Sequence, residues 1–421
     1  MHIHSDILII GAGPAGLAAA RAASQSPDKP TVTLVDENGQ VGGQIWRRSA
    51  PPWAQELVGS AKDDRLRLLS GTSVVEPLKG GALLAVTQGQ PNPLRLSYRW
   101  LILAVGAREL FLPFPGWTLP GVMGAGGAQA MCKAGMDVRG KKIIVAGTGP
   151  LLLAVAVYLK QHGAVIPAIV EQTSSANIRK FAMSLWRTPA KLAQGVKLRA
   201  SLLGVPYWTD AWPTRAAGAG SLQSVTIARA SRGMVQDRTL DADLLACGFG
   251  LVPNTQLAAL IGCEIKGGRV VVDDLQHTTM GEILCAGEPT GIGGVETALI
   301  EGEIAGLVAS NQKDAAMRLR KSRLDARAFA ARLNAAFALR SEVKKLAQDD
   351  TIMCRCEDAT LGQLRRYTSW RDAKLQARCG MGPCQGRVCG PLLREVLGFE
   401  PTDARPPISP VPLGVLAQRH E

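Results

Sequence analysis

Cysteine is the residue whose spacing says most about the chemistry of this 421-residue chain. Five of the nine cysteines lie between positions 354 and 389, as a Cys-x-Cys pair, a third cysteine and a Cys-x4-Cys pair. Thiolates at such spacing are metal ligands or disulfide partners. A Cys-x-Cys pair makes a poor disulfide, because neighbouring side chains of an extended segment point to opposite faces. The pattern therefore favours a metal site, with candidate ligands Cys354, Cys356, Cys379, Cys384 and Cys389.

The amino-terminal segment carries a glycine-rich loop, Gly11-Ala-Gly-Pro-Ala-Gly16, between an apolar strand pattern at 6–10 and an alanine-rich helical pattern at 17–24. Glycines at these spacings allow a tight turn, close approach to a pyrophosphate and close helix–strand packing, and the helix amino terminus stabilises the anion. An acidic residue ends the next strand, at 31–35, and is placed to accept hydrogen bonds from an adenosine ribose. The predicted dinucleotide contacts are Gly11, Gly13, Pro14, Ala15, Gly16, Asp36 and Glu37.

A second unit of the same kind follows about 135 residues later, with a strand at 142–146 and the loop Gly147-Thr-Gly-Pro-Leu-Leu152. Leu152 stands in place of the third glycine, and we expect it to push the helix outward or to reshape the pocket. Glu171 keeps the ribose-binding acid and would repel a 2′-phosphate, which favours NAD over NADP. Two interpretations stay open: a site for NAD or another adenine nucleotide, held by Gly147, Gly149 and Glu171, or a retained fold without a functional pocket.

Three further glycine motifs resemble the additional contacts by which flavoproteins hold FAD. They are Gly42-Gly43-Gln44, Ala104-Val-Gly106, and Ala286-Gly-Glu288 ahead of Gly293-Gly294. In that family the position of Glu288 is usually an aspartate that binds the ribityl chain, so the longer side chain implies a shifted or water-relayed contact. The resemblance implies FAD in this chain or FMN shared with a partner, and it adds Gly43, Gln44, Gly106, Gly287, Glu288 and Gly294 as flavin contacts.

The cysteine-rich segment resembles the bacterioferritin-associated ferredoxin-like domain, which holds a [2Fe–2S] cluster. The resemblance is carried by Cys354-Arg-Cys-Glu-Asp and by Arg378-Cys-Gly-Met-Gly-Pro-Cys-Gln-Gly-Arg-Val-Cys389. Zinc also accepts four thiolates, but a redox body upstream favours iron–sulfur. The ligand set that the resemblance implies is Cys354, Cys356, Cys384 and Cys389. The small ferredoxin has Cys-x-x-Cys as its second pair, whereas this chain has Cys-x4-Cys, so Cys379 is a rival for the fourth ligand.

The order of motifs predicts an α/β fold with two Rossmann-like domains, one inserted into the other, as in glutathione and thioredoxin reductases, which the chain resembles over roughly residues 1–310. A helical connector, a small helical [2Fe–2S] domain and a proline-rich tail follow. A small antiparallel sheet is expected from 83–86 and 94–98, and it leads into the apolar segment at 100–106. The predicted domains are 1–115 with 270–312 for FAD, 116–269 for the inserted domain, 313–350, 351–400 and 401–421.

Composition and charge exclude several classes. The chain is 46% hydrophobic and 20% charged, as expected of a globular protein, and it has neither an apolar run near eighteen residues nor a signal-peptide pattern. We therefore expect no transmembrane segment and a cytoplasmic location, which suits ligating thiols. The net charge of +13 would permit nucleic-acid binding, but the basic residues are scattered, aromatics are 5% and no nucleic-acid module is visible.

No general base, arginine clamp or nucleophile can be nominated for substrate chemistry. His277 is the only histidine near a flavin motif, and a structural role is favoured. Four separate cysteines are expected to be small buried residues, and three tryptophans to serve packing or an interface. These are Cys132, Cys247, Cys263 and Cys285, and Trp186, Trp208 and Trp212.

Taken together, the glycine motifs and Gly380-Met-Gly-Pro-Cys-Gln-Gly386 resemble the large subunits of heteromeric amino-acid dehydrogenases. This family includes the corresponding subunits of opine oxidase and hydrogen cyanide synthase and the alpha chain of D-hydroxyproline dehydrogenase, with sarcosine oxidase alpha as a more distant relative. The resemblance implies an electron-relay subunit. A partner flavoprotein would oxidise a C–N bond of an opine, D-hydroxyproline, proline or glycine. Whether the complex also contains a small third subunit stays open. The alternatives are a self-contained NADH-dependent reductase and a mainly structural subunit.

Overall fold

The computed structural model describes residues 1–61, 65–90, 92–231, 234–400 and 404–417. The chain divides into two compact units, which are described one at a time. Unit 1 comprises Met1–Arg108, Val252–Ala331 and Asp403–Glu421, and unit 2 comprises Glu109–Leu251 and Arg332–Thr402. The domain boundaries at 115/116 and 269/270 stay a prediction. The chain passes from unit 1 to unit 2 in β7 (Ala107–Glu109) and in α11 (Arg320–Ala336), and returns in β16 (Leu251–Pro253).

The sheet of unit 1 has seven strands in the order β3-β2-β1-β6-β5-β4, with β19 also pairing with β6. The parallel part joins β1, β2, β3, β6 and β19. The apolar runs Ile7–Ile10 of β1 and Leu101–Leu103 of β6 lie side by side in it, as expected where both faces of a sheet are covered. The bounds are β1 (His2–Ile10), β2 (Val32–Asp36), β3 (Leu66–Ser70), β4 (Thr72–Leu78), β5 (Ala82–Thr87), β6 (Leu94–Leu103) and β19 (Ile283–Cys285).

The predicted antiparallel pairing of 83–86 with 94–98 is confirmed, since β5 and β6 pair antiparallel. The segment at 94–98 and the start of the segment at 100–106 form one long strand, β6. It pairs parallel with β1 along its length, antiparallel with β5 in its first half and parallel with β19 in its second half. Pairing with β1 keeps the strand continuous, so the antiparallel pair is part of the seven-stranded sheet.

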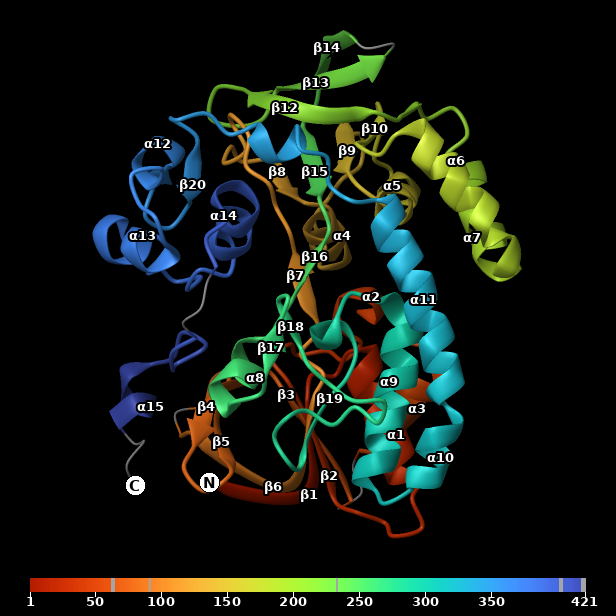
Figure 1. The fold of residues 1–421 in the computed structure, drawn as a ribbon, viewed down its shortest axis with the longest axis vertical. Coiled ribbons are helices and arrows are strands. Elements are labelled where there is room, and N and C mark those ends of the chain that lie inside the picture. The colour runs from red at the N-terminus through yellow and green to blue at the C-terminus, as the bar shows by residue number, and fades with distance from the viewer. Residues whose placement is uncertain (62–64, 91, 232–233, 401–403, 418–421) are drawn as a thin grey trace. The chain divides into compact units, whose positions relative to one another are not determined.

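Helices α1 (Pro14–Ser24) and α9 (Gly294–Ala309) pack side by side against one face of this sheet (Figure 1). Gly302 and Gly306, one helical turn apart, make the close approach possible. A Cβ atom would lie 2.1 Å from the Ala15 carbonyl oxygen at Gly302 and 2.3 Å from the Ala19 carbonyl oxygen at Gly306. The alanine-rich sequence of α1 and these two glycines therefore belong to one helix–helix contact, which brings the start of α9 close to the first glycine-rich loop.

Short elements complete unit 1, and its carboxyl-terminal tail packs on the sheet. The Ile408 amide donates to the Val75 carbonyl of β4 at 2.8 Å, and Val415 joins a cluster with Val75 and Leu84. The rest of the predicted tail, at 401–403 and 418–421, lies outside the described residues. The further elements are α2 (Gly43–Trp46), α3 (Pro52–Gly59), α8 (Gln256–Ile261), β17 (Ile265–Lys266), β18 (Arg269–Val270), the 3-10 helix η2 (Glu288–Thr290), α10 (Lys313–Arg318) and α15 (Leu413–Ala417).

Unit 2 contains a second parallel sheet in the order β11-β10-β9-β15-β8 and an antiparallel sheet in the order β12-β13-β14. The parallel strands are β8 (Val122–Gly124), β9 (Ile143–Gly147), β10 (Ile169–Glu171), β11 (Tyr207–Trp208) and β15 (Leu244–Gly248). The antiparallel strands are β12 (Ala211–Ala217), β13 (Ser224–Ser231) and β14 (Met234–Asp241). The helices are α4 (Ala125–Lys133), α5 (Leu151–Gln161), α6 (Ser175–Ser184), the 3-10 helix η1 (Leu185–Arg187) and α7 (Pro189–Ser201).

The cysteine-rich segment lies in unit 2 as a small, mainly helical module (Figure 1). The indole N–H of Trp117 donates to the Ile352 carbonyl at 2.7 Å, and the Arg355 guanidinium lies 5.4 Å from the Trp117 ring centre. These contacts fix the first strand of the module. The elements are η3 (Val343–Lys345), β20 (Ile352–Cys354), β21 (Ala359–Thr360), α12 (Leu361–Leu364), α13 (Trp370–Ala377) and α14 (Cys389–Leu397). No described helix has the combined length and apolar character needed to cross a membrane.

Candidate functional site: two glycine-rich loops and a cysteine cluster

The first glycine-rich loop has the geometry that its spacing predicts. Gly11 has φ +106°, and a Cβ atom there would lie 2.3 Å from the Ala104 carbonyl oxygen. A Cβ atom on Gly16 would lie 1.8 Å from the Gly11 carbonyl oxygen, so this glycine serves helix–strand packing. Gly13 differs, because the nearest neighbour of a Cβ atom there would be the Gly43 Cα atom, at 3.9 Å. The backbone at Gly13 thus faces open space at the amino terminus of α1, where an anion is stabilised.

Asp36 is 7% exposed at the end of β2 and organises this loop. One carboxylate oxygen accepts from the Ala12 amide at 2.6 Å, and the other accepts from the amide and the side chain of Asn38 at 2.8 and 2.9 Å. Glu37, which we also predicted as a contact, is exposed. The acid that ends the second strand therefore lies beside the glycine-rich loop, as a ribose-binding role requires.

Two of the other flavin motifs approach the same loop. The Gly42 amide donates to the Ala12 carbonyl at 2.7 Å, and a Cβ atom on Gly43 would lie 3.1 Å from the Gly13 Cα atom. Gln44 is exposed. Gly106 has φ +66° and its carbonyl accepts from the Asn254 amide at 3.1 Å. The residues are arranged as a cradle that an FAD pyrophosphate would fit.

Glu288 turns back on the start of α9. Its carboxylate accepts from the Gly293 and Gly294 amides, both at 3.0 Å. Burial raises the pKa of the Glu288 carboxyl, and these two hydrogen bonds oppose the rise. A side chain one methylene longer than aspartate thus caps the helix that follows the motif.

A buried ion cluster behind this loop was not predicted from the sequence. Glu301 is fully buried on α9, where one oxygen pairs with Arg323 at 3.1 Å and with Arg327 at 2.6 Å. Its other oxygen accepts from the Gly287 amide at 3.0 Å and the Thr290 hydroxyl at 2.9 Å. The available signal was a glutamate inside an apolar helix, together with two arginines four residues apart.

Glu301→Ala should destabilise unit 1 by about 3–5 kcal/mol, because it leaves two arginines without their buried carboxylate. Urea unfolding of the flavin-free protein would measure this. Asp137→Ala removes an ion pair with Arg139 in which both side chains are exposed, and it should leave the unfolding midpoint unchanged. Equal midpoints for all three proteins would show that the cluster contributes no stability.

The second glycine-rich loop keeps its acid but encloses it. Glu171 is 0% exposed and accepts from the Gly149 amide at 2.7 Å and the Thr173 amide at 2.8 Å. Burial raises the pKa of its carboxyl, and these amides oppose the rise. Gly147 has φ +133° and lies against Gly248. Leu152, at the place of the third glycine, is fully buried, with its Cδ2 atom 3.7 Å from the position of a Cβ atom on Gly248.

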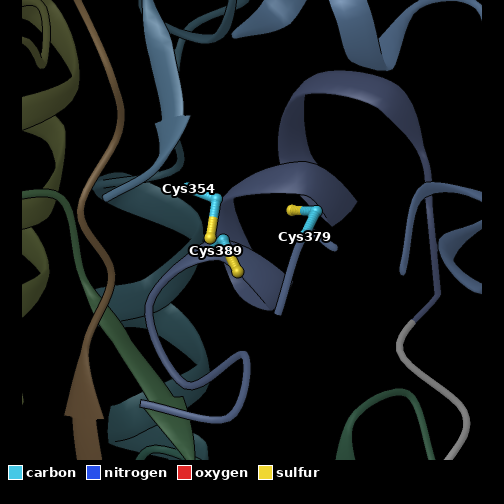
Figure 2. A group of neighbouring side chains, drawn as sticks. All are labelled: Cys354, Cys379 and Cys389. Carbon is cyan, nitrogen blue, oxygen red and sulfur yellow. The ribbon is translucent and has the colours of Figure 1, made fainter. Parts of the chain in front are cut away.

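The cysteine module brings together residues 35 positions apart. Cys354 ends β20, Cys389 begins α14 and Cys379 follows α13, and the three sulfur atoms lie within 4.8 Å of one another (Figure 2). All three residues are buried. Hydrogen bonds, first with Cys379 and then with Cys389, lower the pKa of the Cys354 thiol to about 2.

The other two cysteines extend this group toward the surface. Cys384 contacts Cys389, which lowers the pKa of Cys384 to about 5, and it also contacts Cys356. Cys356 is exposed and Cys384 is half-buried. The contacts therefore run from Cys354 and Cys379 through Cys389 to Cys384 and Cys356. The group of three sulfur atoms within 4.8 Å includes Cys379, which the ligand set implied by the resemblance leaves out. Five adjoining thiols can supply the four ligands of a [2Fe–2S] cluster, in which each iron takes two protein ligands.

Glycines position this loop. A Cβ atom on Gly382 would lie 2.2 Å from the Cys356 Cβ atom, so a side chain there would separate the loop from the Cys-x-Cys strand. Gly380 and Gly386 have φ +82° and +78° and pack on Trp370. The Gly-x-Gly-x-x-x-Gly spacing around Cys384 thus has a steric reason.

The remaining cysteines are buried, as expected for packing residues. Burial raises the pKa of Cys247 and of Cys285, which opposes thiolate formation. They are Cys132, Cys247, Cys263 and Cys285.

The predicted aromatic and histidine residues have separate environments. His277 is half-buried, with its ring centre 5.8 Å from that of Trp100, an environment consistent with a structural role. Trp212 is buried, whereas Trp186 is 71% exposed. Trp208 is half-buried beneath the Arg238 guanidinium.

Comparison with known proteins agrees with this architecture. A family model described as pyridine nucleotide-disulphide oxidoreductase matches residues 5–302. The chain is 30% identical over 454 residues to hydrogen cyanide synthase subunit HcnB of Pseudomonas protegens, which covers 96% of each chain. It is 31% identical over 468 residues to an opine oxidase subunit of Rhizobium meliloti, which covers 98% of each.

Solved structures show the same fold. L-proline dehydrogenase from P. horikoshii matches with a TM-score of 0.71 and 20% identity, over 99% of this chain and 80% of that chain. Thioredoxin reductase from T. acidophilum matches with a TM-score of 0.54 and 19% identity, over 74% and 99%. The chain therefore belongs to the pyridine nucleotide-disulphide oxidoreductase family, as an oxidoreductase of the group that contains the hydrogen cyanide synthase and opine oxidase subunits.

Proposed function

We propose that this chain is the electron-relay subunit of a heteromeric flavin-dependent dehydrogenase that oxidises a C–N bond of an amino or imino acid. The observation that carries the proposal is the convergence of five cysteines in a chain that also has a flavoprotein fold. The relatives support the heteromeric part, since their names describe subunits of opine oxidase and hydrogen cyanide synthase. The name opine oxidase also suggests an opine as the substrate. D-hydroxyproline, proline and glycine are further candidates.

The residues proposed for each cofactor come from the sequence motifs, and the contacts around the first loop and among the cysteines support them. FAD would lie on the first glycine-rich loop beside Asp36. The alternative is FMN at an interface with the partner subunit. A [2Fe–2S] cluster would be held by Cys354, Cys356, Cys384 and Cys389. Together the two groups would convert the two-electron oxidation of the substrate into single-electron steps. Because the ligating thiols need a reducing compartment, we place the protein in the cytoplasm.

The isolated chain should not dehydrogenate any amino acid, and it should gain this activity only with a second flavoprotein subunit. The sequence shows no general base or nucleophile for substrate chemistry, and the described side chains near the first loop are engaged in building it. The test is reduction of an artificial dye with glycine, proline, hydroxyproline and opines, by the reconstituted chain alone and with the partner encoded beside it. Turnover by the chain alone would place the substrate site here and overturn the proposal.

A self-contained NADH-dependent reductase is the second candidate, favoured by Glu171 at the end of β10. In that case the second nucleotide domain would deliver hydride to the flavin. Stopped-flow mixing of the reconstituted chain with NADH separates the two functions. Flavin bleaching within the dead time or in the first seconds would support the reductase, whereas an oxidised flavin would support the relay.

A further inference from the structure

A short segment of unit 2, Phe337–Arg340, lies against the second glycine-rich loop. It follows α11 and leads to the cysteine module. The Thr148 hydroxyl donates to the Phe337 carbonyl at 3.1 Å, and the Gln172 side chain donates to the Ala338 carbonyl at 3.0 Å. The Arg340 amide donates back to the Gln172 side-chain oxygen at 3.0 Å. Thr148 is in the loop itself and Gln172 follows β10, so the segment binds to the carboxyl ends of the parallel strands.

That edge is where open α/β sheets bind ligands. The Phe337 ring lies on the side of the middle glycine where a side chain would project: its Cγ atom would lie 4.0 Å from a Cβ atom on Gly149. This glycine is the one whose missing side chain lets a pyrophosphate approach the backbone. The edge of Phe181 holds the Phe337 ring, with the ring centres 5.6 Å apart and the planes at 76°. At the corresponding Gly13, the nearest neighbour is the backbone of another glycine.

The polar anchors of the second site are also engaged within the protein. Both oxygens of Glu171 accept backbone amides, and the residue is 0% exposed. Gln172 is equally buried, and its side-chain nitrogen is shared among Thr148, Thr173 and the Ala338 carbonyl. Asp36 is engaged in the same way at the first loop, so the segment that lies against the second loop, rather than the engagement of its acid, distinguishes the two sites.

Arg340 fastens the far end of the segment. Its guanidinium donates to the Asp210 carboxylate at 3.1 Å and to the Gln172 carbonyl at 3.3 Å, and it lies 5.0 Å from the Trp212 ring centre. These partners come from three separate places in unit 2, namely the ends of β10 and β11 and strand β12. The segment is thus held by the body of the nucleotide domain at both its phenylalanine and its arginine.

We propose that the segment Phe337–Arg340 is a built-in occupant of the second site, which excludes a dinucleotide until the segment is displaced. NADH and the segment compete for the same edge of the sheet. The segment continues into the cysteine module, so a nucleotide that displaces the segment would also affect the module. By the same coupling, a change in the module would alter the affinity for the nucleotide. If the segment occupies the site in about nine molecules of ten, the apparent affinity for NADH is about tenfold weaker than that of the open site.

The test uses the full chain and NADH as the probe, with binding measured by titration calorimetry. Phe337→Ala and Arg340→Ala should each bind NADH at least about tenfold more tightly than the wild type. Arg238→Ala is the matched control, since Arg238 also lies over a tryptophan ring, at 5.2 Å, but is outside the segment. It should leave the affinity unchanged. Equal affinity, or equal absence of binding, in the wild type and both segment variants would overturn the proposal.

Hydrogen–deuterium exchange of the wild type gives a second readout that needs no variant. Saturating NADH should increase amide exchange at 337–340 while it protects 147–149. Protection of the loop with unchanged exchange at 337–340 would show that nucleotide and segment bind together, against the proposal. Neither readout uses electron transfer, so failure here leaves the relay function standing, and failure of the relay leaves the closed site standing.

Discussion

Gly13→Val is expected to abolish flavin binding while leaving the fold intact. The Gly13 backbone is extended, with φ −78° and ψ −174°, and a Cβ atom there would meet only the Gly43 Cα atom, at 3.9 Å. The protein itself therefore accepts a side chain at this position, and the space that the side chain enters is the space that a pyrophosphate needs. A clash costing about 3 kcal/mol weakens binding roughly 100-fold. Flavin content after purification and circular dichroism of the same samples measure the two halves of the prediction.

The other glycines of the loop provide contrasting controls. Gly16→Ala should impair folding itself, because its Cβ atom would overlap the Gly11 carbonyl oxygen. Asp36→Ala should fold and bind flavin more weakly, by roughly the 1.5–3 kcal/mol of a charge-assisted hydrogen bond. Stoichiometric flavin in folded Gly13→Val protein would show that this loop does not hold the dinucleotide.

Cys389→Ser is expected to eliminate the iron–sulfur cluster, whereas Cys379→Ser should retain it. Cys389 contacts Cys354, Cys379 and Cys384, so it lies at the centre of the group, and its loss removes a thiol that contacts three others. Cys379 contacts Cys354 and Cys389 but lies outside the ligand set that we propose, so its loss leaves all four ligands in place. Protein purified without oxygen should contain about two irons and two labile sulfides per chain in the wild type and in Cys379→Ser. Iron and sulfide assays and the visible spectrum measure this.

Two outcomes would change the assignment. Stoichiometric zinc without iron in the anaerobic wild type would refute an iron–sulfur site. A cluster that survives Cys384→Ser but not Cys379→Ser would make Cys379 the fourth ligand. Serine is the suitable replacement, since it has nearly the size of cysteine and leaves the loop around Gly382 undisturbed.

The local motifs of this protein could be predicted from its sequence. Each βαβ unit, with its strand, glycine-rich loop and acid, lies within about 35 residues. The spacing is typical of such a unit, whose geometry is nearly independent of the rest of the chain. Asp36 and Glu171 consequently lie beside their loops. The clustering of cysteines also identified the module, because a Cys-x-Cys pair and a second pair nearby have few structural uses other than a metal site.

Only the tertiary structure decided what those motifs contact. The sequence left Cys379 as a rival for the fourth ligand, and the turn after α13 places it against Cys354 and Cys389. Glu301 meets Arg323 and Arg327 across 22 and 26 residues. Phe337 reaches a glycine 188 positions earlier in the chain. Such contacts have no period or spacing in the sequence, because they depend on how separate elements pack, and packing is decided by the whole unit rather than by a local pattern.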